Sequence, residues 1–199
     1  LRFATLLSHI IFTASKESFR LWSVKVHVMG HGIDVNFFSP DPTIVRGNQV
    51  LSVGRLMPTK RHDLAIRAAA IKGCELFVIG EGPERTNLEL LAHSLAAQVC
   101  FLGGLTQAQL RDEYRKAAFL VHTSETGSLD KVILEALATD VAVITTSDVF
   151  REFPVHTVSA TPEAIAKALE YTRESYDRVK IIREHHSLQR LIPAILGAI

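Results

Sequence analysis

Residues 50–79 read VLSVGRLMPTKRHDLAIRAAAIKGCELFVI: a short apolar run, a polar turn, a segment of helical period and a second apolar run. Val50–Val53 and Leu76–Ile79 are predicted to be strands because both are short and contain β-branched residues. His62–Ile71 is predicted to be a helix because its apolar residues recur three and four positions apart, and Gly73 is suited to end it. A strand, a helix and a strand in this order predict neighbouring parallel strands.

The same alternation extends over most of the chain. Further strands are predicted at Val24–Met29, Val99–Leu102, Phe119–His122, Val141–Thr145 and Val155–Val158. Further helices are predicted at Glu84–Ala97, Gln107–Ala117, Lys131–Thr139 and Thr161–Arg173, with Thr106 and Thr161 as N-caps. Strands that are apolar throughout are covered on both faces. The predicted fold is therefore α/β, a Rossmann-like parallel sheet with helices on both faces.

The domain organisation follows from the same pattern. Residues 24–174 are predicted to form the Rossmann-like domain. Residues 1–23 open in mid-pattern without a methionine, and we interpret them as a remnant or linker from a missing N-terminal domain. Two helical stretches, Tyr176–His185 and Leu188–Leu196, follow the last strand without returning to the sheet, so residues 175–199 are expected to pack toward the missing part.

Composition limits the possible partners. The 199 residues carry a net charge of +1, so no bulk attraction to nucleic acid or acidic membranes is expected. Two cysteines, Cys74 and Cys100, are too few for a disulfide framework, which favours a cytoplasmic protein in which they are buried small hydrophobes. No apolar stretch is long enough to cross a bilayer, so any peripheral membrane contact is expected only through the missing part.

The loop after the first of these strands carries two cations. Gly54 permits close approach of a ligand, and the guanidinium of Arg55 and the ammonium of Lys60 together suit a diphosphate. The spacing does not match GxxxxGK[ST], so ordinary nucleotide triphosphate hydrolysis is not supported. A solvated basic loop explains this segment alone equally well.

The next loop, Gly80–Glu84, holds half of a GxGxxG motif. Arg85 stands where a dinucleotide fingerprint needs its third small residue. A tight turn is therefore the preferred interpretation of Gly80 and Gly82.

The segment SETGSLDKVILEALA, residues 124–138, is a small polar loop that runs into a helix. Asp130 or Ser128 is predicted to cap that helix, and the amide groups of its first turn would face the same crevice as Arg55 and Lys60. Glu135 lies one turn into an otherwise apolar helix. It is either an exposed residue, the slightly favoured interpretation, or an acceptor for ligand hydroxyls.

Several colinear segments together resemble a known family. These are VGRLMPTKRHDLAIRA, LFVIGEGPE, VCFLGGLTQAQLRDEYRKAAFLVHTS and SLDKVILEALATDVAVITT, preceded by VMGHGID and FSP. They resemble the C-terminal half of group 1 (family 4) retaining glycosyltransferases, from roughly Ile11 to Ile144. The resemblance implies the donor-binding half of a two-domain, GT-B type enzyme, which transfers a hexosyl-type sugar from a UDP-, GDP- or ADP-linked donor to an acceptor held by the missing N-terminal domain.

The resemblance also implies roles for particular residues. Arg55 and Lys60 fall on the family's diphosphate-binding cations, which neutralise the leaving group and are assigned as catalytic. Glu135 falls on the glutamate that accepts hydrogen bonds from the ribose. The other expected donor-binding residues are Gly54, Phe101, Leu102 and Gly103, of which the last three hold the base, and Gly127, Ser128, Leu129 and Asp130.

Two positions depart from the family pattern. The family's first glutamate stands eight residues before the second, where this chain has Gly127. Glu125 and Asp130 are out of register, and either replaces it only if the loop conformation differs. Arg61 stands where a glycine often follows the lysine.

Metal and cofactor chemistry is not expected. There is no DxD motif, and the family stabilises its leaving group without a bound metal or cofactor. The nine histidines are expected to be mainly solvated or capping residues. His122 is interpreted as a hydrogen-bonded residue at the core edge, and His31 as structural.

Other functions remain open at this stage. The same fold could belong to a nucleotide-sugar epimerase or a phosphorylase-like enzyme, since fold does not fix the reaction, although no segment suggests a pyridoxal-phosphate lysine. Gly127 also leaves open a non-catalytic α/β nucleotide-binding or scaffold module. Alone, the chain is expected to bind donor but transfer no sugar.

Overall fold

A computed structural model describes residues 2–15, 18–19, 21–170 and 177–198. Its centre is a six-stranded sheet in the order β5-β4-β3-β6-β7-β8, in which every pair of neighbours is parallel. The strands are β3 (Gln49–Val53), β4 (Leu76–Ile79), β5 (Val99–Gly103), β6 (Ala117–His122), β7 (Ala142–Thr145) and β8 (His156–Thr157). The predicted α/β parallel sheet is confirmed.

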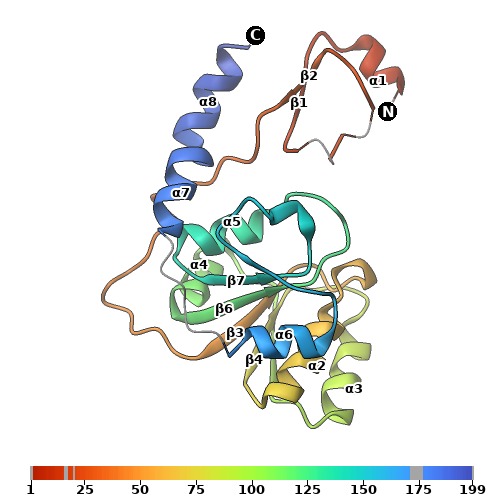
Figure 1. Ribbon diagram of the computed structural model, residues 1–199, viewed down its shortest axis with the longest axis vertical. Coiled ribbons are helices and arrows are strands. Elements are labelled where there is room, and N and C mark those ends of the chain that lie inside the picture. Colours follow the sequence, from red (N-terminus) through yellow and green to blue (C-terminus); the bar gives the residue numbers. More distant parts are fainter. Residues whose placement is uncertain (1, 16–17, 20, 171–176, 199) are drawn as a thin grey trace.

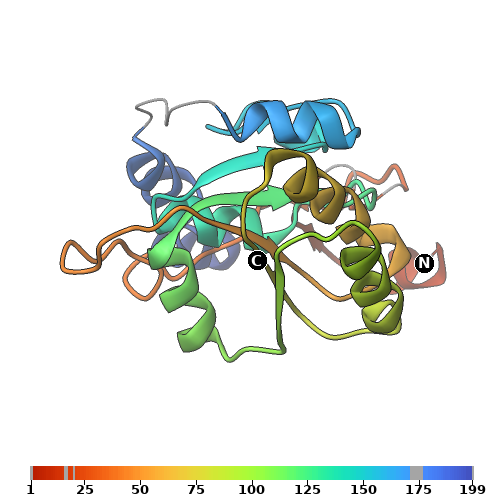
Figure 2. The ribbon, with the colours of Figure 1, turned by 90° about the horizontal axis from the view of Figure 1, so that it is seen from below.

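Helices cover both faces of this sheet (Figure 1). One layer contains α2 (His62–Lys72), α3 (Arg85–Ser94) and α6 (Pro162–Ala168); the other contains α4 (Gln107–Lys116), α5 (Lys131–Ala138) and α7 (Arg178–His185). Figure 2, seen from below, shows α6 and α4 on opposite sides of the strands. Each face has its own apolar core, so the central strands are buried on both sides. Two short 3-10 helices, η1 (Pro58–Lys60) and η2 (Asp148–Phe150), lie in loops.

The order of strands creates a switch point between β3 and β6. From β3 the chain proceeds outward to β4 and β5, then returns to the other side of β3 and proceeds outward again through β6, β7 and β8. Loops that leave the carboxyl ends of two strands diverge at such a point and open a crevice for ligands. The loops in question are residues 54–61 after β3 and residues 123–130 after β6.

Local signals in the sequence explain where most helices begin and end. Thr106 forms a full capping box with Gln109, and Thr161 accepts a hydrogen bond from the amide of Ala164. Gly73 ends α2 in the left-handed conformation, as predicted. The predicted helix 84–97 stops earlier, at Ser94, because Ala96 adopts a left-handed φ of 49°. The last residues of the predicted helix 161–173 lie outside the described residues.

One predicted strand belongs elsewhere. Val24–Met29 was expected to join the large sheet, but β2 (Val26–Val28) instead pairs in parallel with β1 (Ile11–Thr13) in a separate two-stranded sheet. The expectation of one sheet is therefore wrong at this point. A short β-branched run has the same composition in either sheet, and only the choice of neighbour distinguishes them. The small sheet follows α1 (Arg2–Leu7) and lies beyond one end of the main sheet (Figure 1).

The two C-terminal helices behave differently from each other. α7 packs against α5, and its Ile182 is completely buried in the core. α8 (Leu188–Leu196) extends away beside the turn at Gly32, and the Ile33 and His186–Leu188 backbones are joined by two hydrogen bonds. Contact of these helices with further parts of the protein stays a prediction.

Candidate functional site

Two of the predicted site residues meet at the switch point. Lys60 ends η1 after β3, and Asp130 lies directly before α5 after β6. The Lys60 ammonium lies 2.6 Å from Asp130 Oδ2 and 3.2 Å from Ser124 Oγ. Thr123 Oγ1 donates to the carbonyl oxygens of Lys60 and Arg61, at 2.9 and 2.8 Å, which joins the two loops. The topology therefore brings together segments 70 residues apart.

Asp130 was predicted as a possible helix cap, and this prediction is wrong for its side chain. The residue occupies the N-cap position of α5, but no side-chain capping bond forms. Its Oδ2 accepts hydrogen bonds from Lys60 and from His122 Nε2, the latter at 2.8 Å, while Ser128 Oγ donates to Oδ1 at 3.3 Å. The Asp130 carboxylate thus contacts Lys60 and His122 and does not cap the amide groups in the first turn of α5.

The charge state of Asp130 follows from these partners. Burial by itself would raise its pKa, but the hydrogen bonds from His122 and Lys60 outweigh burial and hold the pKa well below its usual range. Asp130 is therefore ionised at neutral pH, and the charge of Lys60 is locally compensated.

Arg55 differs from Lys60 in its surroundings. Its side chain is exposed, and it forms no ion pair or side-chain hydrogen bond with the described residues. It stands at the carboxyl end of β3, on the same loop as Lys60, with its guanidinium uncompensated. The two predicted cations therefore lie on one loop. Lys60 is bound by Asp130 and Ser124, whereas the Arg55 side chain has no such partner among the described residues.

Glu125 and Arg61 pair with each other away from Lys60. Arg61 Nη1 lies 2.5 Å from Glu125 Oε1, and Arg61 Nε lies 3.0 Å from Asp63 Oδ1. Arg61 adopts a left-handed φ of 51° between η1 and α2, a conformation that favours glycine. Of the two carboxylates considered as replacements for the missing glutamate, only Asp130 contacts Lys60.

The loop before α5 leaves open space at Gly127. This residue has a φ of 64°, and a Cβ built on it would have no neighbour within 4 Å. Ser128 faces Asp130, whereas Leu129 is buried in the core beneath the loop. Of the loop residues predicted to bind donor, Leu129 therefore contributes mainly to packing.

Glu135 is buried, so the slightly favoured interpretation as an exposed residue is wrong. It is 9% exposed, and the hydroxyl of the fully buried Tyr114 lies 3.5 Å from its Oε2. Burial raises the pKa of this carboxyl, partly offset by the Lys131 charge and the Tyr114 hydroxyl. Amphipathic period alone did not reveal this, because both faces of α5 are covered.

The glycines at 80 and 82 serve a tight turn with close backbone approach, as preferred from the sequence. A Cβ on Gly80 would lie 1.9 Å from the carbonyl oxygen of Gly54, and one on Gly82 would lie 2.2 Å from that of Leu56. The amide of Gly54 donates to Ile79, and the amide of Gly80 donates to Gly103. These contacts align the loops after β3, β4 and β5 into one layer.

The segment predicted to hold the base forms the end of β5. The guanidinium of Arg85 lies 4.8 Å above the Phe101 ring, and Phe101 and Leu102 are partly buried. The carbonyl oxygen of Gly103 accepts a hydrogen bond from the amide of Gly80. The structure therefore places Phe101–Gly103 on the same edge of the sheet, two strands away from β3.

Histidines contribute more to the site than the sequence suggested. His122 is buried and hydrogen-bonded, as expected, but it contacts Asp130 on one side and Thr145 on the other. His62 is also buried, with Nδ1 2.8 Å from Ser52 Oγ, and burial lowers its pKa to about 4. Their positions at the end of a strand and the start of a helix were the available signals. Cys74 and Cys100 are only partly buried, contrary to expectation.

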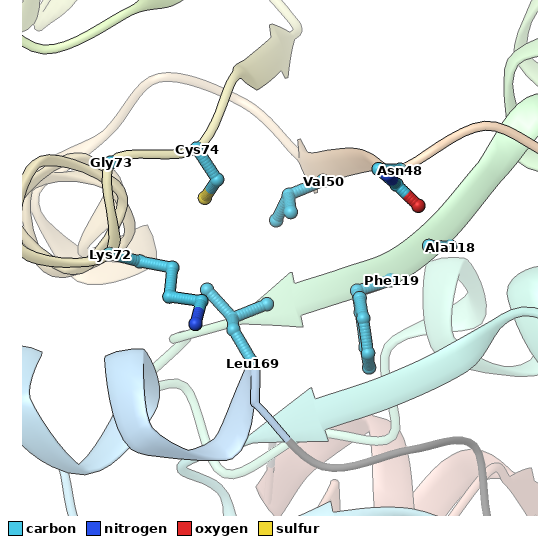
Figure 3. A pocket seen from close by; sticks show the side chains of 8 residues that line it. All are labelled: Asn48, Val50, Lys72, Gly73, Cys74, Ala118, Phe119 and Leu169. Atoms are coloured by element: carbon cyan, nitrogen blue, oxygen red, sulfur yellow. The ribbon is translucent and has the colours of Figure 1, made fainter.

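Among the residues that the structure describes, no group of three His, Cys, Asp or Glu side chains could hold a metal ion, and no helix is long and apolar enough to cross a membrane. A hollow of about 280 Å³ lies at the opposite, amino-terminal edge of the strands (Figure 3). It is lined by Asn48, Val50, Lys72, Gly73, Cys74, Ala118, Phe119 and Leu169. None of the predicted site residues lines it.

A doubly wound parallel sheet, with a cationic loop after β3 and an acidic loop after β6 meeting at its switch point, defines a Rossmann-like α/β protein with a candidate ligand site at that edge. Residues 37–182 match the model of the glycosyl transferases group 1 family. The chain belongs to this family, as the sequence motifs predicted.

Curated relatives agree with this assignment. The chain is 30% identical, over 142 residues, to a GDP-mannose-dependent alpha-mannosyltransferase of Mycobacterium tuberculosis, a match that covers 66% of the chain and 36% of the relative. It is 32% identical over 138 residues to a D-inositol 3-phosphate glycosyltransferase of Mycobacteroides abscessus, covering 60% of the chain and 31% of that relative. The matched part thus spans about a third of the length of these relatives.

Solved structures show the same fold. Anabaena HepE in complex with UDP-glucose superposes with a TM-score of 0.86 at 16% identity, over 100% of this chain and 66% of that one. The C-terminal domain of a group 1 family glycosyl transferase from Francisella tularensis superposes with a TM-score of 0.68 at 20% identity, over 79% of this chain and 100% of that one. The architecture is that of GT-B glycosyltransferases.

Proposed function

We propose that the chain is the donor-binding part of a retaining glycosyltransferase that binds a nucleotide-diphosphate sugar at the β3–β6 switch point. The observation that carries the proposal is the contact of Lys60 with Asp130, directly before α5, on the loop that also carries Arg55. A helix N-terminus with two cations is suited to a diphosphate. The UDP complexes among the structural neighbours support a ligand of this class.

The donor would be held by groups along this edge of the sheet. Arg55 and Lys60 would bind the diphosphate, and Gly54 and residues 127–130 would line its approach. Glu135 would accept hydrogen bonds from the ribose, a role consistent with a buried carboxylate near the start of α5. Phe101–Gly103 would hold the base.

The chemistry proposed is transfer of a hexosyl group with retention at the anomeric carbon. The bond between that carbon and the diphosphate oxygen breaks, an acceptor oxygen forms the new bond, and the acceptor proton leaves with the departing diphosphate. Negative charge grows on the leaving diphosphate, where Arg55, Lys60 and the dipole of α5 would stabilise it. Fixed cations would take the part that a divalent ion plays elsewhere, so no metal or cofactor is required by this proposal.

The acceptor would be bound by a further, N-terminal domain. Support comes from the coverage of only about a third of the curated relatives and from the two-stranded β1–β2 sheet, since so small a parallel sheet is rarely stable alone. Trp22, in the loop before β2, is 91% exposed, as expected of a surface that another part of the protein covers. We further propose a cytoplasmic location, with any membrane contact made by that domain.

The proposal is tested by thermal-shift titration of the chain with UDP, GDP and ADP, repeated on the Arg55→Ala, Lys60→Ala double variant. A nucleotide at about a hundred times its dissociation constant stabilises a folded protein by roughly 2.7 kcal/mol. Stabilisation by one nucleotide that disappears in the double variant is expected and would identify the base. No stabilisation by any of the three would favour a scaffold module, and stabilisation unchanged in the variant would place the diphosphate elsewhere.

A further inference from the structure

We propose that Asp130 is a positioning residue for Lys60. His122 and Thr145 anchor the Asp130 carboxylate to the ends of β6 and β7. The inference rests on the proposed function, because it specifies how one donor-binding cation is held. It gives Asp130 a role other than the direct donor binding that the resemblance implies, and it adds His122 and Thr145, for which the resemblance implies no role.

The first step is the geometry at the carboxylate. One oxygen, Asp130 Oδ2, accepts from both Lys60 Nζ at 2.6 Å and His122 Nε2 at 2.8 Å. The Asp130 side chain is 17% exposed and that of Lys60 is 22% exposed, so the pair is shielded more than a surface salt bridge. Charge-assisted hydrogen bonds of this length are about twice as strong as neutral ones.

The second step is the anchor behind the carboxylate. His122 is 5% exposed, and its ring packs edge-on against Phe150 with 5.7 Å between centroids. Because an ionised carboxylate can only accept, His122 Nε2 carries the proton shared with Asp130. On the other side of the ring, His122 Nδ1 lies 3.0 Å from Thr145 Oγ1, and that oxygen accepts a hydrogen bond from the amide of Ser147 at 3.1 Å. The series of contacts from Lys60 through Asp130 and His122 to Thr145 therefore ends on β6 and β7, two strands of the main sheet.

The third step is the consequence for Lys60. A lysine side chain loses conformational entropy when it is fixed, and a ligand that has to fix it binds more weakly for that reason. Here two of the three N–H groups of Lys60 are directed to Asp130 and Ser124 before any ligand arrives. The third N–H is available to an anionic oxygen of a ligand. Arg55 has no comparable partner among the described residues.

Glu125 supplies a matched contrast on the same loop. Its carboxylate also pairs with a cation of the preceding loop, but that cation is Arg61, and the Glu125 side chain is 56% exposed. Within the described part of the chain, no buried side chain anchors the Glu125 carboxylate. If any acidic residue of this loop merely adjusted the local charge, Glu125 and Asp130 would have similar effects.

A double-mutant cycle tests the inference in the 199-residue chain. The probe is whichever of UDP, GDP and ADP binds in the titration above, and the readout is its dissociation constant by calorimetry. Asp130→Ala is expected to weaken binding roughly tenfold when Lys60 is present and less than about twofold in the Lys60→Ala background, the non-additivity of residues that act through each other. Asp130→Asn keeps the shape and is expected to give an intermediate loss. Glu125→Gln is expected to leave affinity unchanged.

Each other outcome overturns the inference. An equal loss in both backgrounds would mean that Asp130 contacts the ligand itself or supports the fold. Tighter binding in Asp130→Ala and Asp130→Asn would mean that the carboxylate competes with the ligand for Lys60. Failure of the unmodified chain to bind any of the three nucleotides would overturn the proposed function as well, so the two failures are distinguishable.

Discussion

Gly80 lies so close to Gly54 that a Cβ on Gly80 would fall 1.9 Å from the carbonyl oxygen of Gly54. The two residues follow neighbouring strands, and their contact aligns the loop that carries Arg55 and Lys60 with the loop before α3. The turn at Gly80 thereby supports the candidate site without containing any of its charged groups.

Gly80→Ala is therefore expected to be severely destabilising. The added methyl group meets backbone, which cannot yield as a flexible side chain can, so a loss of at least about 3 kcal/mol in the free energy of unfolding is expected. Urea denaturation measures it. Gly73→Ala is the control, because both glycines have a positive φ, 140° at Gly80 and 67° at Gly73, but at Gly73 no atom lies within 4 Å of the added methyl. Equal losses in the two variants would show that backbone conformation alone matters.

Arg61 combines a strained backbone with two ion pairs. Arg61→Gly removes the cost of a left-handed φ in a residue with a side chain, roughly 1 kcal/mol. It also removes the partly exposed ion pairs with Asp63 and Glu125, each of which stabilises the fold by about 0–1 kcal/mol. The free energy of unfolding is expected to change by less than about 1 kcal/mol. Arg61→Val loses the pairs and keeps the strain, so it is expected to be clearly less stable. Chemical denaturation of both variants compares them, and equal stability would contradict the explanation.

The burial of His62 is expected to make the protein less stable in acid. Its pKa is lowered to about 4 by burial, against an ordinary value of 6.5, so the unfolded chain binds the additional proton between these two pH values. The contribution of the neutral ring is complete above pH 6.5 and declines as the pH falls toward 4. A loss on the order of 3 kcal/mol follows from a shift of this size.

Denaturation midpoints measured from pH 7 to 4 check this dependence. His62→Gln is expected to flatten the profile in this window whatever its effect at pH 7, whereas His93→Gln, at an exposed position of α3, is expected to leave the slope unchanged. A His62→Gln profile parallel to that of the unmodified chain would contradict the prediction. His186, whose pKa burial also lowers to about 4, contributes in the same window and in the same direction.

Lys60 and Arg55 are expected to differ in their effect on stability although both would bind diphosphate. Lys60→Met keeps the hydrocarbon stem but removes a cation from the partly buried Asp130, for which a loss of about 1–2 kcal/mol at pH 7 is expected. Arg55→Met removes an exposed cation with no ion-pair partner among the described residues, so the free energy of unfolding should hardly change. Differential scanning calorimetry without nucleotide compares them. A larger loss for Arg55→Met would show that the partners are wrongly assigned.

Most of the fold could be predicted from the sequence, because the spacing of apolar residues and the residue types at helix ends indicate the helices and strands. The strands of the main sheet and the helices between them are local features, because short β-branched runs and caps such as Thr106 act within a few residues. The neighbour of Val26–Val28 was wrongly predicted because strand composition does not specify a partner. Glu135 was misjudged for a related reason, since burial depends on what covers a helix.

The sequence by itself determined the α/β class, the family and the loops on which Arg55, Lys60 and Asp130 stand. Only the tertiary structure decided which of these groups meet. Lys60 and Asp130 are 70 residues apart and contact each other because β3 and β6 are neighbours at the switch point, a consequence of strand order. The role of Asp130 as a partner of Lys60 and His122, and that of Glu125 as a partner of Arg61, depend on side-chain directions set by the folded loops. Hydrogen bonds between distant segments exist only once the whole sheet has formed, so no local pattern encodes them.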